Sequence, residues 1–130
     1  MISITSKSPY AIAALVELYL HGDSDPVPVA ELARRREIPV QFLEQLFAIL
    51  RRAGVLRSQR GVGGGYSFAR RPAEISVLEV VELLDGPVGG GSRGVFAEAA
   101  EAARAVLSRS TVADVAEAEA QAAATPMYHI

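Results

Sequence analysis

Apolar side chains recur every three or four residues along most of the chain, and this spacing predicts a series of helices. The first helix begins with Ser8 as its N-cap and Pro9 at its first helical position, where a missing N–H is tolerated. It ends at His21-Gly22, before a turn-rich loop. Ser76 and Thr111 are expected to cap two of the later helices. These later helices are predicted over residues 29–36, 40–53, 77–84, 95–108 and 112–124.

The helices over residues 29–36 and 40–53 are separated by about three residues, which is the arrangement of a helix-turn-helix. After Gly54, which stands where a left-handed helix end belongs, the helical period changes to alternation. Two short strands are predicted, over residues 55–59 and 66–70. The glycine-rich segment 60–65 joins them into a hairpin. The pattern therefore predicts a mainly α fold with a small β-hairpin, a winged helix-turn-helix domain followed by C-terminal dimerisation helices.

A glycine-rich stretch separates the winged unit from the last two helices. Residues 85–94 contain five glycines and one proline, so we expect a loop or a hinge there. The next helix carries a narrow stripe of mostly small apolar residues, which fits a helix–helix seam better than a full core. The expected dimer interface consists of Phe96, Ala99, Ala103, Val106 and Leu107. The chain thus divides into a DNA-binding domain (1–84), the loop (85–94), and a dimerisation helix with a C-terminal helix (95–130).

The composition excludes several kinds of chemistry. The chain has no cysteine, which rules out disulfides, thiolate zinc sites, cysteine nucleophiles and ordinary iron–sulfur ligation. The only two histidines, His21 and His129, lie far apart in the sequence, and no triad-like spacing accompanies them. We therefore expect no metal, no cofactor and no enzymatic activity. No segment reaches the roughly 18 apolar residues of a membrane helix, and residues 1–7 do not resemble a signal peptide, so a cytoplasmic location without a membrane partner is expected.

The net charge of −2 conceals an asymmetry between the two halves of the chain. Residues 1–72 carry ten basic and six acidic side chains, whereas residues 73–130 carry three and nine. A basic half suits a polyanion, and an acidic, alanine-rich half suits protein contacts or solvent, although ordinary charge scatter explains the counts equally well. Nine of the basic residues flank the predicted helix-turn-helix and hairpin: Arg34, Arg35, Arg36, Arg51, Arg52, Arg57, Arg60, Arg70 and Arg71.

The second helix of the helix-turn-helix has the features of a recognition helix. Its apolar stripe must face inward, which leaves a polar group at its exposed N-terminal end: Pro39, Val40, Gln41, Glu44 and Gln45. Gln can bond in a bidentate manner to adenine, and Glu can accept from the amino group of cytosine. Taken alone, this pattern is more common on an ordinary solvated helix face. Expected phosphate contacts nearby are Lys7, Ser8, Arg51 and Arg52.

The glycine-rich segment before Tyr66 has two interpretations. A phosphate cradle of a nucleotide-binding enzyme would precede a helix, but the alternation of Tyr66-Ser67-Phe68 predicts a strand. We interpret the segment as a wing, whose glycines let the backbone approach a DNA groove and whose Arg60 enters a narrow minor groove. A plain, floppy hairpin tip is the alternative. The predicted wing residues are Arg60, Gly61, Gly63, Gly64, Gly65 and Tyr66.

Three stretches, residues 5–11, 42–47 and 60–66, resemble the signature of the Rrf-type (IscR/NsrR/CymR) winged-helix transcription regulators. The resemblance is strong over about residues 1–85 and looser over the dimerisation helix. It implies that residues 38–53 form the recognition helix and that Arg60 and the glycines form the wing. It also implies that the helix near residues 95–108 crosses the same helix of a second copy.

One departure from this family matters for function. Its cluster-binding members carry three cysteines in the loop that here spans residues 85–94, and this loop has none. The chain resembles the cluster-free branch, whose signal comes from a small molecule or a partner protein. Our leading hypothesis is a homodimeric regulator, a repressor in the first instance, that binds double-stranded DNA at a palindromic promoter site without an iron–sulfur cluster. The alternative is a winged-helix module for protein–protein assembly that does not bind DNA.

Overall fold

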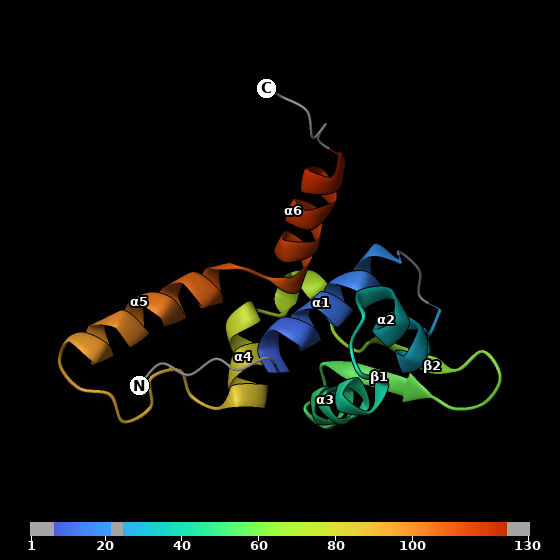
Figure 1. Ribbon diagram of the computed structural model, residues 1–130, viewed down its shortest axis with the longest axis horizontal. Coiled ribbons are helices and arrows are strands. Elements are labelled where there is room, and N and C mark those ends of the chain that lie inside the picture. The colour runs from blue at the N-terminus through green and yellow to red at the C-terminus, as the bar shows by residue number, and fades with distance from the viewer. Residues whose placement is uncertain (1–6, 22–24, 125–130) are drawn as a thin grey trace.

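Helices make up most of the structure, and a single hairpin lies between the third and the fourth α-helix (Figure 1). The computed structural model describes residues 7–21 and 25–124. Its elements are α1 (Lys7–Leu20), α2 (Val29–Arg36), α3 (Val40–Arg52), β1 (Leu56–Gln59), β2 (Gly65–Phe68), the short 3₁₀ helix η1 (Pro72–Glu74), α4 (Val77–Asp85), α5 (Val95–Arg109) and α6 (Val112–Ala124). The predicted fold class is confirmed. Within these residues no helix is long and apolar enough to cross a membrane.

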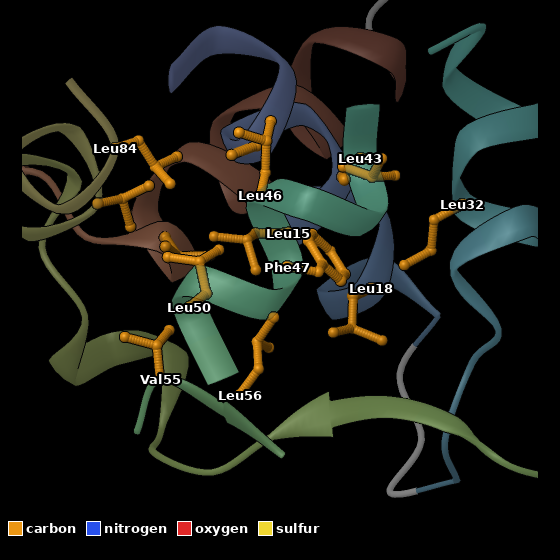
Figure 2. Packing of buried hydrophobic residues seen from close by; sticks show 14 of the residues in the cluster. Leu15, Leu18, Leu32, Leu43, Leu46, Phe47, Leu50, Val55, Leu56 and Leu84 are labelled. Atoms are coloured by element: carbon orange, nitrogen blue, oxygen red, sulfur yellow. The ribbon is translucent and has the colours of Figure 1, made fainter. Parts of the chain in front are cut away.

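The core lies between α1 and α3. Leu15 of α1 and Phe47 of α3 have no exposed surface, and Figure 2 shows them together at the centre of the cluster. Leu84 of α4 and Leu56 of β1 close the cluster from other sides. Fully burying a leucine or phenylalanine side chain contributes about 1.5–3 kcal/mol. The core therefore fixes α3 against α1, whereas α5 extends to one side of the body and α6 rises from its top in Figure 1.

The hairpin is held at both edges of β2. Its register pairs Leu56 with Phe68 and Gln59 with Gly65. On the other side of β2, the backbone groups of Tyr66 and Val27 exchange two hydrogen bonds, of 2.9 and 2.8 Å. The strands are one or two residues shorter than predicted at their outer ends. A single edge strand would be weakly held, so this extra bridge gives the wing a firm base.

Both helices of the helix-turn-helix end in the same hydrogen-bonded turn. At the end of α3, Gly54 is left-handed with φ 80°, and the N–H of Val55 donates to the carbonyl of Leu50 at 3.0 Å. At the end of α2 the left-handed residue is Glu37, with φ 54°, and the N–H of Ile38 donates to the carbonyl of Ala33. Glu37 is the only described non-glycine residue with positive φ. The tight turn between α2 and α3 thus forms although its sequence lacks glycine.

The predicted caps of the later helices are confirmed, whereas the one at Ser8 is wrong. The Ser76 side chain accepts from the N–H of Glu79, and Thr111 and Asp114 accept from each other's N–H groups at 3.0 Å. The first helix already includes Lys7, so Ser8 lies inside it. Ser8 is buried, and its hydroxyl donates to Asp85 at the end of α4. A contact so distant in sequence could not be read from the local pattern.

An ion-pair network joins α1 to α2 and α2 to α6. The Glu17 carboxylate of α1 accepts from Arg35 at 3.2 Å and from Arg36 at 2.9 Å, and Arg36 also pairs with Glu119 of α6 at 2.6 Å. Burial raises the pKa of Glu17, but the hydrogen bonds and charges of Arg36 and Arg35 outweigh it, so the pKa lies below its ordinary value of 4.5. The ionised carboxylate is therefore the form that the fold stabilises.

We expect Glu37→Gly to stabilise the protein. A left-handed backbone costs an L-residue about 1–2 kcal/mol, and the greater freedom of glycine in the unfolded chain offsets part of that gain, which leaves about 0.5–1 kcal/mol. Urea denaturation measures the change. Gly54→Ala is the matched control: it has the space for a Cβ but the same positive φ, and should destabilise. A loss of stability in Glu37→Gly would contradict the role assigned to the turn.

We expect Glu17→Gln to cost about 1–2 kcal/mol at neutral pH, because it removes a charged acceptor from Arg35 and Arg36. A lowered pKa in the folded state gives stability above the unfolded pKa that is lost as the pH falls through the folded value. The difference in free energy of unfolding between the wild type and Glu17→Gln should thus be constant near neutrality and shrink below about pH 4.5. Urea midpoints across this range test it, and a difference that persists at low pH would argue for lost packing instead.

Candidate nucleic-acid interface

The outward face of α3 carries the polar residues that the helical period assigns to it. The inward stripe of Leu43, Leu46, Phe47 and Leu50 is buried. The exposed residues at the N-terminal end are Pro39, Val40, Gln41, Glu44 and Gln45. Amide and carboxylate groups therefore stand together within two turns of helix. These are the groups that can read base edges in the major groove of DNA.

The beginning of α3 also presents backbone donors. Its N-cap is Pro39, and no side chain caps the helix. The N–H groups of the first turn point away from the helix, where their partial positive charge favours an anion such as phosphate. Tyr10 of α1 lies edge-on to Phe42, with ring centroids 5.7 Å apart. This contact braces the exposed end of α3 against the body of the domain.

The backbone conformation of the hairpin loop itself requires glycine at several positions. Gly61 and Gly63 have φ of 93° and 77°, a region that side-chain-bearing residues rarely adopt. A Cβ at Gly64 would lie 2.3 Å from a carbonyl oxygen of β1, and one at Gly65 would lie 2.3 Å from the backbone of Val27. The loop is a tightly wound tip. The backbone of the loop therefore needs these glycines whether or not they also allow a close approach to DNA.

The wing exposes two side chains and uses a third as its support. Arg60 is exposed, and Val62 at the tip is fully exposed at 108 %. Val62 is absent from the predicted set because one apolar residue between glycines produces no periodic signal. Tyr66 was expected among the DNA contacts, but it is half-buried and lies edge-on to Phe47 at 5.2 Å between ring centroids. Tyr66 therefore connects the wing to the core.

The nine arginines near the helix-turn-helix fall into two groups. Four of them pair with carboxylates: Arg34, Arg35, Arg36 and Arg70. Five are without an ion pair within the described residues: Arg51, Arg52, Arg57, Arg60 and Arg71. A paired arginine must give up a carboxylate before it binds phosphate, so the second group is the better phosphate-binding set. All five lie at the end of α3 or along the hairpin and its end.

The predicted phosphate contacts at the beginning of α1 have different environments. Lys7 is exposed at the first position of the helix. Ser8 is only 2 % exposed, and its hydroxyl is bonded to Asp85. We therefore remove Ser8 from the set of phosphate contacts and keep Lys7, Arg51 and Arg52.

A second candidate surface lies on α5. Its exposed apolar residues repeat with the spacing of a helix–helix seam: Val95, Ala99, Ala102 and Val106. Phe96 lies beside this seam with 64 % of its surface exposed. Ala103 and Leu107, which were expected in the same seam, are already half-buried by this chain. An exposed apolar stripe of this kind marks a site of protein–protein contact.

The loop between α4 and α5 is anchored at its centre. Val88 is buried, and its N–H donates to the Glu82 carboxylate at 3.3 Å. Glu82 in turn pairs with Arg104 of α5. Gly89 lies so close to Ala100 that a Cβ would stand 2.1 Å from the alanine Cβ. The expected loop is present, and contacts that the sequence does not reveal hold its middle to α4 and α5.

The arrangement defines a winged helix-turn-helix protein, with α2 and α3 as the helix-turn-helix and β1–β2 as the wing. The family model Rrf2, described as an iron-dependent transcriptional regulator, matches residues 4–118. The chain belongs to the Rrf2 family of transcriptional regulators. The resemblance expected from its sequence motifs is confirmed.

Individual relatives agree with this assignment. The chain is 44 % identical over 85 residues to the HTH-type transcriptional regulator IscR of Aliivibrio salmonicida, a match over 65 % of this chain and 51 % of that protein. It therefore spans about half the length of the curated relatives that it matches. Among solved structures it resembles the global cysteine regulator CymR of B. subtilis, with a TM-score of 0.82 and 26 % identity over 90 % of this chain and 98 % of that one. It also resembles T. potens IscR, with a TM-score of 0.80 and 29 % identity over 98 % and 94 %.

The residues present do not fit the iron that the family description implies. With no cysteine in the chain, no thiolate is available to an iron–sulfur cluster. Within residues 7–21 and 25–124, no three His, Asp or Glu side chains gather as a metal site would require. In the loop that follows α4, Val88 is buried and Gly89 packs on Ala100.

Proposed function

We propose that this protein is a sequence-specific DNA-binding transcription regulator, not an enzyme, that acts as a homodimer on a palindromic promoter site. One observation carries the proposal: the exposed polar end of α3, the wing and five arginines that have no carboxylate partner within the described residues all lie between residues 39 and 71. The names of the curated relatives, HTH-type transcriptional regulators, support it. The DNA-binding part comprises residues 1–84.

The side chains take distinct roles in this proposal. Gln41, Glu44 and Gln45 read base edges in the major groove, because their amide and carboxylate groups match the donors and acceptors exposed there. Arg60 enters the adjacent minor groove, whose negative potential is greatest where it is narrow. Lys7, Arg51 and Arg52 contact phosphates, which position the protein without reading sequence.

A second copy covers the stripe on α5. The exposed seam of Val95, Ala99, Ala102 and Val106 repeats at helical spacing, so the same stripe of a second chain can pack against it about a two-fold axis. Two-fold symmetry of the protein matches two-fold symmetry of the DNA site. The helices after residue 95 thus serve dimerisation.

The alternative, an assembly module that does not bind DNA, explains less of the structure. Exposed acidic residues on α6 suit a protein partner. Such a module gives no reason for the five arginines at the end of α3 and along the hairpin that have no ion pair within the described residues. We further infer that the regulator works without an iron–sulfur cluster and that its signal is a small molecule or a partner protein. The lack of thiolates supports the first inference.

We expect Arg60→Ala and Glu44→Ala to affect DNA binding in different ways. A duplex selected from a random pool by the wild-type protein serves as the probe, and fluorescence anisotropy measures affinity. Arg60→Ala should weaken binding and remove any preference for a narrow minor groove. Glu44→Ala should relax the preference at one base position by about 1–3 kcal/mol and leave non-specific binding intact.

Arg34→Ala is the matched control, because this arginine is exposed but paired with Glu31 on α2. It removes the same charge and should change affinity little. If no duplex in the pool binds with salt-dependent affinity, the proposed function is wrong. If Arg60→Ala and Glu44→Ala lose affinity equally on all sequences, only the assignment of roles is wrong.

We expect Val106→Glu on α5 to dissociate the dimer. The substitution places a charge inside an apolar seam in each of two symmetric positions, and the loss in association free energy should exceed about 2 kcal/mol. Light scattering at micromolar concentration measures the mass. Ala30→Glu, at an exposed position of α2, is the control and should remain dimeric. A wild-type mass of one chain with undiminished DNA affinity would overturn the proposed dimer.

A further inference from the structure

The hairpin has a polar outer face that carries Arg57, one of the five arginines without an ion pair within the described residues. Side chains alternate along its strands, and Leu56 and Phe68 point into the core. The next pair along the ladder, Arg57 and Ser67, therefore points to the opposite side. Directly opposed residues of an antiparallel pair have Cβ atoms about 4.5–5.5 Å apart. Arg57 and Ser67 are thus neighbours on the outside of the wing.

These two side chains line a hollow in the surface. Its lining residues are Pro26, Arg57, Ser58, Gln59 and Ser67. By the same alternation Ser58 points to the inner side, so the outer face offers a guanidinium, one hydroxyl and one amide as hydrogen-bond donors, from Arg57, Ser67 and Gln59. No carboxylate is among them. Such a set of donors with one positive charge is suited to an oxyanion, and phosphate forms strong charge-assisted hydrogen bonds with arginine.

Arg57 is available for this purpose. It is exposed, and it makes no ion pair within the part of the chain that the structure describes. Arg70, which follows the other end of the hairpin, differs because it is paired with Glu79 at 2.6 Å. The fold therefore pairs Arg70, which follows the hairpin, with a carboxylate. It leaves Arg57 on the outer face without one within the described residues.

The position of Arg57 relative to the wing tip favours the DNA backbone as the source of the phosphate. Arg57 precedes Arg60 by three residues of extended chain, which corresponds to about 10 Å at 3.3–3.4 Å per residue. The minor groove is only about 6 Å wide, and phosphates form its walls. The loop carrying Arg60 projects beyond the helices in Figure 1. With Arg60 in the groove, a long side chain at Arg57 is within reach of the sugar–phosphate wall beside it.

We propose that Arg57 and Ser67 form a phosphate-binding site for the DNA backbone on the outer face of the wing. The inference rests on the proposed DNA binding and adds a contact that the recognition helix and the wing tip do not supply. Its ligand is a phosphodiester of duplex DNA. The same donors would accept free inorganic phosphate, and the experiment separates these two sources.

The test measures affinity for the selected duplex and for a scrambled duplex between 50 and 200 mM salt. Each phosphate contact contributes about 0.9 to the slope of log affinity against log salt, which is about a 3.5-fold change per protomer over this range. The proposed homodimer carries the substitution twice, so Arg57→Ala should lower the measured slope by about 1.8, or about 12-fold over this range. The loss should be equal on both duplexes, because a phosphate contact carries no sequence information. Arg57→Lys should retain the slope, and Ser67→Ala should weaken binding without changing it.

Arg34→Ala is the control for loss of one exposed positive charge and should keep the wild-type slope. A slope in Arg57→Ala equal to that of Arg34→Ala would overturn the proposal. A loss confined to the selected sequence would also overturn it, because Arg57 would then read a base. Circular dichroism of each variant confirms that the hairpin substitution leaves the fold intact.

Inorganic phosphate at matched ionic strength distinguishes the two sources. If phosphate weakens DNA binding by the wild type but not by Arg57→Ala, while their salt slopes are the same, the site holds a free anion and the proposal is wrong. Failure of the wild-type protein to bind any duplex would overturn the proposed function and this site with it. Normal wild-type binding with an unaltered Arg57→Ala slope would overturn this site alone.

Discussion

The packing of α3 on α1 is the contact on which the rest of the structure depends. One stripe of α3, centred on Phe47, has no exposed surface, and Leu15 of α1 faces it. A helix with one stripe so firmly held can present only the opposite stripe to a partner. Gln41, Glu44 and Gln45 face outward for this reason. The same phenylalanine contacts Tyr66 of the wing, so the orientation of the hairpin depends on it as well.

Some arginines are paired with carboxylates and others are not. This difference separates the arginines that hold helices together from those that can bind a polyanion. Glu17, Glu31 and Glu119 engage the three consecutive arginines at the end of α2, so the densest cluster of positive charge in the sequence holds helices together. The arginines near the wing are left without such partners within the described residues. Pairing, and not the number of arginines, therefore determines where a polyanion can bind. Because the carboxylates come from α1, α2 and α6, this sorting is a property of the folded chain.

The second half of the chain combines a loop that is held by several contacts with a helix, α5, that exposes apolar side chains. Glu82 links the loop to α5 through Val88 and Arg104, and Gly89 packs on Ala100. The first two residues of α5, Val95 and Phe96, are exposed in a single copy of the chain. In the proposed dimer, this connection would transmit a change at α5 to the proposed DNA-binding part. This loop contains no cysteine, and its middle is held by the buried Val88 and by the close approach of Gly89 to Ala100.

Elements that depend on local physics could be predicted from the sequence alone. Helical and strand periods set the elements to within one or two residues, Ser76 and Thr111 cap their helices, and Gly54 ends α3, because each involves neighbours within about four residues. The tertiary structure decided the rest. Only folding brings Ser8 to Asp85, Arg36 to Glu119 and Gly65 to the backbone of Val27. Contacts between residues distant along the chain leave no periodic trace, so the sequence identified the surface of α3 but not which arginines remain free to bind.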